Sequence, residues 1–502
     1  MDLENRFFGE VMTESIVLDG LTQEEKSLAV FAQGVLNRKG KRIFIDCDNY
    51  RSYTGGDLAE VGLWDLIKKY SGEFSGAVVY DLDENDVSVN MAATVCATGD
   101  YLGVPRALIN KVDALGIKTL FDLSEIKGTR AQKQREIFEK CKDKLSKNAA
   151  VHQVVKSGNF HLTLRDKAIC DRLICFYTSE NEEDRAFRKE VLEWLDKCSP
   201  IYGWNDDEIA FIKDISARGD YAVPTDWSSN HSYFKNSGVS VKQNVKRTEI
   251  APNKHYVAFV VSDGDNVQWL ERDFSTTHIF GQRQKSHSDY KITWTLSPSL
   301  ADICPQATEN IYKTIKHDYF ISGVSGVGYC NPMTFPKKYL DAFTEKTEKL
   351  MKRSDMSVVC LLDNINNTTN SSNTRDRLNS YAKYDTIKGG IWELDPDRYC
   401  SGNGKIFWAN DKPFVSVRFT MWHPSGKMAN VDAEWLDGIV DAINGMTADA
   451  HSEKGYSVVN VHPWTMSMES IDYVAARLKP HIQLVYADEL VDLITKNVKR
   501  EK

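Results

Sequence analysis

The chain has 502 residues, of which 42% are hydrophobic and 11% aromatic. This length exceeds one ordinary domain, so we expect two or three domains with packed cores, and the composition excludes global disorder. The formal charge is −8, and no basic cluster with interleaved aromatic residues is present. The sequence therefore argues against nucleic acid as a partner.

The ten cysteines are scattered and form no Cys-x-x-Cys pair, which excludes the usual structural zinc modules and favours reduced thiols. The first residues are charged and lack the apolar core of a signal peptide. No apolar run approaches the 18 or so residues of a membrane span, so we expect no membrane association. These features predict a cytoplasmic protein; the alternative is a secreted protein whose leader has been removed.

Residues 1–110 alternate between helical and strand patterns. The helical patterns cover 21–36, 58–70 and 90–98, and the strand patterns cover 42–46 and 76–81. Thr22 precedes the first helix and two glutamates follow in its first turn, which is typical of a capped helix. The alternation predicts a first α/β domain with a parallel sheet.

Residues 111–245 predict a second α/β domain. Helical patterns cover 127–145, 184–197 and 207–217, and extended patterns cover 173–177 and 221–224. The following segment contains Asp226, Trp227 and Asn230 and is too short for a core element. We predict that this segment is a loop whose Asp226 and Asn230 reach toward the mouth of the next domain, the alternative being a turn that joins domains.

Residues 251–502 show the most regular pattern. Candidate strands cover 256–262, 291–297, 319–324, 357–362, 387–392, 413–419, 456–462 and 482–487, and helical stretches at 311–317, 337–352, 432–444 and 470–478 lie between some of them. Such strand–helix repetition predicts a TIM-like (β/α) barrel with seven or eight strands. The predicted fold class is thus α/β, with two smaller α/β domains in front of a C-terminal (β/α) barrel.

The first barrel strand ends in Ser262-Asp263-Gly264-Asp265-Asn266. Residues at the carboxyl ends of barrel strands form the reactive face, so these side chains are candidates for catalysis and binding. If strand geometry persisted, Asp263 and Asp265 would lie about 6.5 to 7 Å apart on one side. Two close carboxylates raise one pKa, which suits a general acid. The alternative is an Asx turn that caps its own backbone.

A glycine-rich loop, residues 323–332, follows the third candidate strand. Gly326 and Gly328 permit close ligand approach, and Tyr329 offers a flat face and a hydroxyl group. The loop lacks the Lys-Ser/Thr of a P-loop and the spacing of a dinucleotide-binding fingerprint. We interpret it as a substrate-binding loop, with a plain tight turn as the alternative.

Further strand ends carry carboxylates or histidines, and tryptophan stands beside several of them. The predicted catalytic residue among them is Glu393, and the predicted binding residues are Asp363, Trp392, His423, His462 and Trp464. An acid or base beside an aromatic platform suits a carbohydrate site. The alternative for each tryptophan is packing in the core or at the barrel rim, and for His423 a structural hydrogen bond. Asp488 and Glu489 close the last strand, although Asp488 equally fits the N-cap of the final helix.

The segment Gly326-Val327-Gly328-Tyr329-Cys330-Asn331-Pro332 resembles the name-giving motif of the GxGYxYP family of putative glycoside hydrolases. Residues 262–268 resemble a second signature of that family, and residues 79–93 and 226–230 are similar to its N-terminal domains. The resemblance implies a C-terminal barrel that processes carbohydrate, with accessory domains in front. Asn331 departs from the motif, which has a second tyrosine there, and this departure places the role of that tyrosine in doubt.

A looser likeness connects the Asp-rich first strand end and the late Val-His-Pro segment to metal-dependent polysaccharide deacetylases. By that likeness Asp263, Asp265 and His462 would hold one divalent metal ion. The closely spaced histidine pair of those enzymes is not evident after Gly323, so we predict no cofactor and keep the metal ion as the alternative.

The leading hypothesis is a glycoside hydrolase that acts on an oligosaccharide or glycoconjugate by carboxylate acid/base chemistry. The alternatives are a metal-dependent carbohydrate esterase and a non-catalytic glycan-binding protein. The density of ionisable groups at strand ends argues against binding alone, which needs aromatic and amide groups more than carboxylates. The predicted partner is therefore a carbohydrate substrate.

Overall fold

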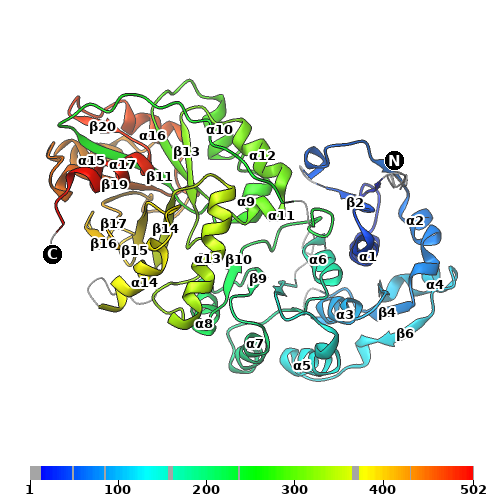
Figure 1. The fold of residues 1–502 in the computed structure, drawn as a ribbon. Helices are drawn as coiled ribbons and strands as arrows, with labels where there is room; N and C mark the ends of the chain where they lie inside the picture. The colour runs from blue at the N-terminus through cyan, green and yellow to red at the C-terminus, as the bar shows by residue number, and fades with distance from the viewer. Residues whose placement is uncertain are drawn as a thin grey trace, which may run out of the picture. The chain divides into compact units, whose positions relative to one another are not determined.

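The computed structural model describes residues 13–47, 50–83, 86–155, 162–235, 238–364, 372–429 and 431–500, except the side chains of residues 372 and 373. The chain forms two compact units, which Figure 1 colours along the sequence. Unit 1 comprises Met1–Asp196, Ile201–Asp206 and Thr225–Ser237. Unit 2 comprises Lys197–Pro200, Asp207–Pro224 and Gly238–Lys502.

Short parallel strands and helices alternate through the unit 1 part of the chain, as the sequence predicts. The strands are β1 (Glu14–Val17), β2 (Ile43–Asp46), β3 (Ala59–Glu60), β4 (Gly76–Tyr80), β5 (Tyr101–Pro105), β6 (Thr119–Asp122), β7 (Ala150–His152), β8 (Cys175–Phe176) and β9 (Pro200–Gly203). The helices are α1 (Gln23–Leu36), α2 (Leu63–Lys69), α3 (Ser88–Ala97), α4 (Ile109–Asp113), α5 (Arg130–Cys141), α6 (Arg165–Cys170) and α7 (Glu182–Trp194). β1 pairs with β2 and β3, β4 with β5 and β6, and β7 with β8 and β9, all in parallel.

Helix α1 confirms the predicted cap. The Thr22 side chain accepts a hydrogen bond from the backbone N–H of Glu25 at 3.2 Å, and the Glu25 carboxylate accepts one from the backbone N–H of Thr22 at 3.1 Å. This reciprocal capping box satisfies two of the amide groups that a helix start leaves without partners.

Unit 2 contains the predicted strand–helix repeat. Its strands are β10 (Tyr221–Val223), β11 (His255–Val261), β12 (Ile292–Leu296), β13 (Asp318–Ser322), β14 (Val358–Asp363), β15 (Gly389–Leu394), β16 (Ile406–Ala409), β17 (Lys412–Ser416), β18 (Phe419–Met421), β19 (Tyr456–Val461) and β20 (Ile482–Leu484). Its helices are α8 (Glu208–Arg218), α9 (Val267–Glu271), α10 (Ile279–Lys285), α11 (Leu300–Ile303), α12 (Pro305–Lys313), α13 (Lys337–Arg353), α14 (Ser372–Ala382), α15 (Ala433–Asn444), α16 (Met468–Ala475) and α17 (Ala487–Asn497).

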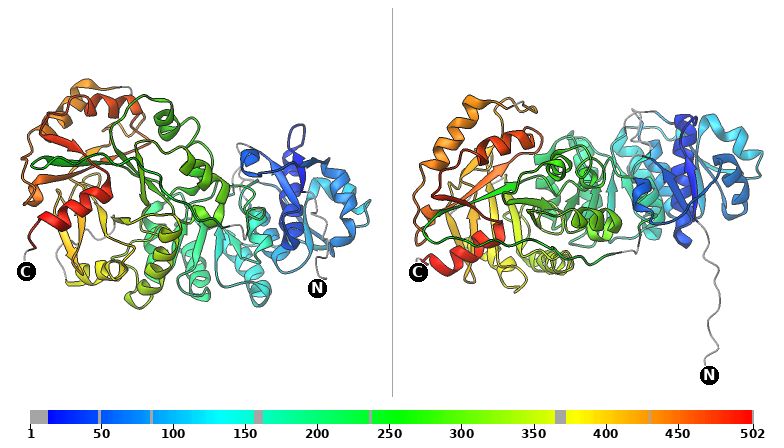
Figure 2. Two further views of the ribbon diagram at one scale, coloured as in Figure 1. Left: turned by 45° about the horizontal axis from the view of Figure 1, so that its top comes forward. Right: turned by 90° about the horizontal axis from the view of Figure 1, so that it is seen from above.

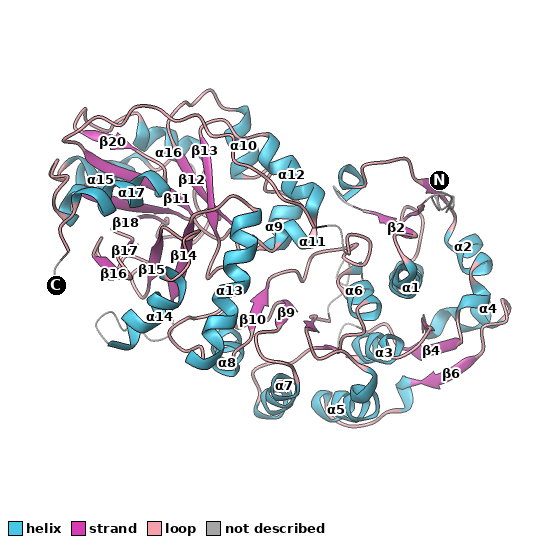
Figure 3. Cartoon of the chain, viewed as in Figure 1, coloured by secondary structure: helices cyan, strands magenta, loops and turns pink. Residues whose placement is uncertain are grey.

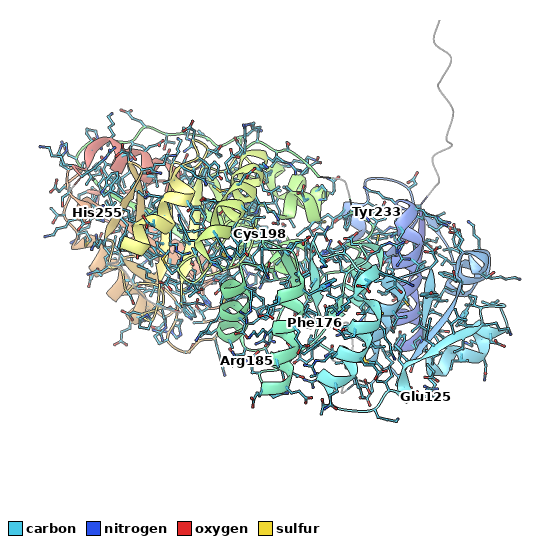
Figure 4. All side chains as sticks on the ribbon, turned by 60° about the horizontal axis from the view of Figure 1, so that its bottom comes forward. Glu125, Phe176, Arg185, Cys198, Tyr233 and His255 are labelled. Carbon is cyan, nitrogen blue, oxygen red and sulfur yellow. The ribbon has the colours of Figure 1, made fainter. Side chains whose placement is uncertain are left out.

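The main sheet of unit 2 has the order β16-β17-β15-β14-β13-β12-β11-β19-β18, with β20 paired to β11. All its described pairs are parallel except β16 with β17. Figure 3 shows these strands in magenta among the helices of unit 2, and Figure 2 gives two further views. All seven residues of β11, which begins at His255 (labelled in Figure 4), are buried, as expected for a parallel strand covered on both faces.

The chain passes from one edge of this sheet to the other between β17 and β18. The backbone N–H of Val417 donates to the Trp392 carbonyl in β15 at 3.1 Å, and that of Arg418 donates to the Val458 carbonyl in β19 at 2.9 Å. The predicted α/β class and parallel strands are confirmed. The strand pairing itself, however, does not form a closed TIM barrel among the described residues.

All ten cysteines are free. Within the described ranges, we find no helix that is both long enough and apolar enough to cross a membrane.

Candidate active site

The turn after β11 carries both predicted aspartates. Gly264 lets this turn approach β12 closely: its N–H donates to Thr295 Oγ1 at 2.9 Å, and a Cβ at this position would lie 1.8 Å from the Thr295 carbonyl oxygen. Asp263 has a left-handed φ of 66°. The extended strand therefore ends before Asp263, and the strand spacing assumed for Asp263 and Asp265 does not apply. Both aspartates are partly exposed.

Asp263 accepts hydrogen bonds at both carboxylate oxygens. Ser262 Oγ donates to Oδ2 at 2.5 Å, and the indole Nε1 of Trp464 donates to Oδ1 at 2.9 Å. Both carboxylate oxygens of Asp263 are therefore held in place by protein groups. Trp464 is thus a predicted site residue that the structure joins directly to a predicted aspartate.

Two other carboxyl groups lie in the electrostatic field of Asp263. Removal from bulk water, together with the charges of Asp263 and Glu208, raises the pKa of Asp265 well above its ordinary value. Burial and the charges of Asp263 and Asp265 likewise raise the pKa of Glu393, which lies on β15 and is 2% exposed. The surroundings of Asp265 and Glu393 therefore disfavour the ionised form relative to a carboxyl group in water.

Asp395 and Tyr399, just after β15, extend this cluster. Burial raises the pKa of Asp395, and the charge of Asp363 adds to that effect. Burial and the charges of Asp263 and Glu393 raise the pKa of Tyr399 well above its ordinary value. Both residues are partly exposed. Neither was predicted from the sequence, although Asp395 also follows a strand end and the same rule would have included it.

Tyr329 connects the glycine-rich loop to α8 and β14. Its backbone N–H donates to the Ala222 carbonyl and its carbonyl accepts from the Ala222 N–H, both at 2.8 Å. Its hydroxyl donates to Glu208 Oε1 and accepts from Asn364 Nδ2, each at 2.8 Å. Tyr329 is only 3% exposed, so its ring is not an open stacking face. Its hydroxyl instead joins the loop to Glu208 and Asn364.

Gly326 and Gly328 permit this close packing of the loop. Gly326 has a φ of 125°, and a Cβ there would lie 2.5 Å from Thr347. A Cβ at Gly328 would lie 2.4 Å from the Tyr221 ring. Both distances are shorter than side-chain contacts allow, which explains why this loop requires glycine.

Asn331, at the position where the motif has a second tyrosine, is fully buried. Its Nδ2 donates to Asp363 Oδ1 at 2.9 Å, and its backbone N–H donates to Ser216 Oγ at 2.9 Å. The predicted binding residue Asp363 therefore holds the glycine-rich loop. Asn266, also predicted to bind substrate, is the N-cap residue of α9, and its buried Oδ1 has no hydrogen-bond partner among the described residues.

Aromatic rings stand beside Asp263 and Tyr399. The His462 ring is stacked on Trp422, with 3.8 Å between centroids and 3° between planes. Tyr399 meets Trp422 edge-on at 5.3 Å. Burial lowers the pKa of His462, while the charge of Asp263 opposes that effect. Trp422 is partly exposed.

Other predicted residues have separate surroundings. Trp392 is fully buried and packs against Phe407 with 4.8 Å between ring centroids. It precedes Glu393 on one strand, where successive side chains point to opposite faces. His423 is within hydrogen-bonding distance of Ser425 at 2.7 Å and of Asp432 at 3.3 Å.

Asp226 and Asn230 belong to unit 1. The Asn230 amide donates to the Ile45 carbonyl at 2.9 Å, and its Oδ1 accepts from the Ile45 N–H and from Gln33 Nε2. The Asp226 carbonyl accepts a hydrogen bond from Gln153 Nε2 at 3.2 Å. The Asn230 side chain therefore has a structural role within unit 1.

Glu208 is the site residue that sequence reasoning missed most clearly. It lies in the first turn of α8, more than 50 residues before Asp263, and α8 was assigned to the preceding domain. Burial of its carboxyl group and the charge of Asp263 raise the pKa of Glu208, while the hydrogen bond from Tyr329 opposes the shift. No local pattern links Glu208 to the strand ends; only its contact with Tyr329 does.

The residues do not fit the alternative metal site. Among the described residues, no three His, Cys, Asp or Glu side chains are placed so that they could hold one metal ion. Both carboxylate oxygens of Asp263 accept hydrogen bonds from protein groups, and His462 Nδ1 lies 3.2 Å from Thr465 Oγ1. We therefore derive no chemistry through a metal ion bound by Asp263, Asp265 and His462.

Comparison with known proteins identifies the family. Three domain profiles match: the GxGYxYP putative glycoside hydrolase C-terminal domain over residues 253–495, the GxGYxYP third domain over 151–236 and the GxGYxYP_N second domain over 74–140. None of the curated proteins matches the chain.

Two solved structures are similar. The crystal structure of a putative hydrolase from Bacteroides thetaiotaomicron VPI-5482 is 25% identical, with a TM-score of 0.82, over 98% of this chain and 96% of that one. A putative polysaccharide deacetylase from Mycobacterium smegmatis is 9% identical with a TM-score of 0.32, over 53% of this chain and 98% of that one. With three family domains along its length, the chain belongs to the GxGYxYP family of putative glycoside hydrolases.

Proposed function

We propose that this protein is a glycoside hydrolase that cleaves an oligosaccharide or glycoconjugate by carboxylate acid/base chemistry. The observation that carries the proposal is the contrast between two partly exposed aspartates on one turn. Both oxygens of Asp263 accept hydrogen bonds from protein groups, whereas the pKa of Asp265 is raised well above its ordinary value by burial and by the charges of Asp263 and Glu208. Carboxyl groups whose environments differ in this way are the usual acid and base of glycosidases.

In this mechanism Asp265 is the proton donor. As the bond between the anomeric carbon and the glycosidic oxygen breaks, Asp265 gives its proton to that oxygen, which leaves as a hydroxyl group. Asp263 stabilises the positive charge that develops on the sugar. A water molecule then adds to the anomeric carbon and gives a proton to the Asp265 carboxylate, which restores the acid. We assign Glu393 a positioning role, because it is 2% exposed and its pKa is raised by burial and by the charges of Asp263 and Asp265.

The surrounding residues suit a sugar. Trp422, Tyr399 and Trp464 are partly exposed aromatic residues close to the acidic groups. Flat apolar faces beside carboxyl groups match the mixed apolar and polar surface of a carbohydrate. Trp464 would have two roles: its ring would contact the sugar, and its indole N–H holds Asp263 in place.

The architecture supports the same reading. The carboxylates follow the carboxyl ends of β11 and β15, where barrel enzymes carry their reactive groups. We interpret unit 2 as a (β/α) barrel whose edges meet through Val417 and Arg418, which donate to β15 and β19 respectively. Membership of the GxGYxYP family and likeness to a putative hydrolase support hydrolytic chemistry.

The test is product analysis by mass spectrometry after incubation with a pooled panel of native and acetylated oligosaccharides. We expect release of whole sugar units by the wild-type protein and none by Asp263→Asn or Asp265→Asn. The Asp263→Asn side chain fits without strain, because its amide can face the Ser262 hydroxyl, which can turn to accept. Asp441→Asn, an exposed change on α15, is the matched control and should keep full activity.

Two outcomes would contradict the proposal. Undiminished cleavage by Asp263→Asn would remove Asp263 from the chemistry. Release of acetyl groups with sugar chains intact would instead show an esterase. Urea unfolding of each variant must match the wild type, so that a loss of activity cannot be attributed to a loss of fold.

A further inference from the structure

The Trp464 side chain packs against two other aromatic rings. The centroid of its ring lies 4.9 Å from that of Trp269 and 5.1 Å from that of His278, with the ring planes tilted by 51° and 45°. Trp269 and His278 also meet each other edge-on, with 5.2 Å between their centroids. Each of the three rings therefore contacts the other two, so a rotation of the Trp464 ring would displace at least one neighbour.

Both neighbouring rings are themselves held in place. Trp269 lies on α9, is 5% exposed and packs edge-on against the buried ring of Phe274 at 4.9 Å. His278 precedes α10 directly and is partly exposed. Its backbone is fixed by a tight turn, in which the N–H groups of residues 276–278 all donate to the Asp273 carbonyl at 2.9 to 3.2 Å. The Trp464 ring thus rests on one buried ring and one ring at the protein surface.

One hydrogen bond connects these rings to Asp263. Trp464 Nε1 donates to Asp263 Oδ1 at 2.9 Å. Hydrogen bonds weaken steeply as the donor turns away, so the orientation of the indole limits the orientation of the carboxylate. Residues 262–278, which connect β11 to α10, contain both the carboxylate and the two rings that hold its hydrogen-bond donor.

The surroundings of His278 suit a ring that contributes packing. Burial lowers the pKa of His278 below its ordinary value, although the charge of Asp273 opposes that effect, and this favours the uncharged ring at neutral pH. The Nδ1 atom is buried and has no hydrogen-bond partner among the described residues. Phenylalanine should therefore be able to replace His278, whereas a residue without a ring should not.

We propose that His278 is a positioning residue for Asp263: its ring holds the Trp464 indole in the orientation from which Nε1 donates to the carboxylate. The proposal rests on the glycoside hydrolase function proposed above, in which Asp263 stabilises the charge that develops on the sugar. A carboxylate that turns away from this charge stabilises the transition state less. Loss of the His278 ring should therefore lower kcat and leave KM nearly unchanged.

The first measurement needs no substrate. The hydrogen exchange rate of the Trp464 indole N–H is followed by NMR of protein labelled in its indole nitrogens, and the Trp464 signal is the one absent from Trp464→Phe. We expect His278→Ala to speed this exchange by about 10-fold, toward the rate in Asp263→Ala, which lacks the acceptor. His278→Phe should keep the wild-type rate. If His278→Ala does not fold, His278→Gln, which also lacks a ring, takes its place. His287→Ala changes an exposed histidine near α10 and is the matched control.

The second measurement is a double-mutant cycle on kcat, with an oligosaccharide that the wild type cleaves in the product analysis. His278→Ala and Trp464→Phe should each lower kcat by about 10-fold. Phenylalanine at position 464 keeps a ring but lacks the N–H, so both changes act on the same hydrogen bond. The double variant should therefore be no slower than Trp464→Phe alone, and His278→Phe should keep the wild-type kcat.

Three results would overturn the inference. An unchanged exchange rate in His278→Ala would show that this ring does not hold the indole. A double variant about 100-fold slower than the wild type would show that His278 acts independently of Trp464. A low kcat in His278→Phe would assign the effect to the imidazole nitrogens instead of the ring. If the wild type cleaves no oligosaccharide, the hydrolase function fails, and the exchange rates alone decide whether His278 holds Trp464 against Asp263.

Discussion

Replacing Glu393 by glutamine tests the electrostatics of the site without any substrate. The pKa of Glu393 is raised well above its ordinary value, first by burial and then by the charges of Asp263 and Asp265. An acid whose pKa is higher in the folded than in the unfolded protein binds more protons in the folded state. The free energy of unfolding therefore falls as pH rises from the unfolded pKa, about 4.3, up to the folded pKa.

The magnitude follows from the single proton involved. Over each pH unit in this window, Glu393 lowers the free energy of unfolding by about 1.4 kcal/mol. Glutamine has the same shape and no proton to lose, so Glu393→Gln removes this slope. The variant should be as stable as the wild type below the unfolded pKa and should become progressively more stable than the wild type as pH rises through this window.

The assay is urea unfolding from pH 5 to pH 8, followed by tryptophan fluorescence. Seven of the 11 tryptophans lie in unit 2, so this signal mainly reports the unit that contains Glu393. Glu434→Gln, an exposed change on α15, is the matched control and should keep the wild-type pH dependence. Equal pH slopes for wild type and Glu393→Gln would refute the reasoning, since Glu393 would then titrate normally.

Three other changes have definite expected outcomes. Trp464→Phe removes the 2.9 Å hydrogen bond to Asp263 and should lower kcat/KM by about 10-fold or more, measured in steady-state assays of released sugar. Gly326→Ala places a Cβ 2.5 Å from Thr347 at a φ of 125° and should destabilise the protein by about 1–3 kcal/mol in thermal unfolding. Thr22→Ala removes the capping box of α1 and should cost about 1 kcal/mol by urea unfolding.

The sequence predicted the positions of the strands in unit 2 well because burial on both faces leaves unbroken apolar runs. Each of the eight predicted strands overlaps an observed strand, from β11 to β20. The antiparallel β16 was not predicted. It forms a hairpin with β17 through Asn410 and Asp411, whose φ values of 42° and 66° are those of a two-residue hairpin turn. The Asn-Asp dipeptide could therefore have predicted this turn.

The candidate site was predictable only where its residues follow a strand. Asp263, Asp265 and Glu393 were predicted in this way, and the charges of both aspartates contribute to the raised pKa of Glu393. Trp392 shows that adjacency in the sequence does not place two side chains in one site. Side chains alternate along β15, so Glu393 and Trp392 point to opposite faces, and Trp392 is fully buried. Glu208 was out of reach, because a contact across more than 100 residues leaves no local pattern.

The glycine-rich motif acquires a physical meaning from the same contacts. Gly326 and Gly328 let the loop pack closely, and this packing brings the Tyr329 hydroxyl between Glu208 and Asn364. A stacking platform would need an exposed ring, whereas Tyr329 is 3% exposed. The motif therefore holds the Glu208 side chain relative to the strand ends through the Tyr329 hydroxyl.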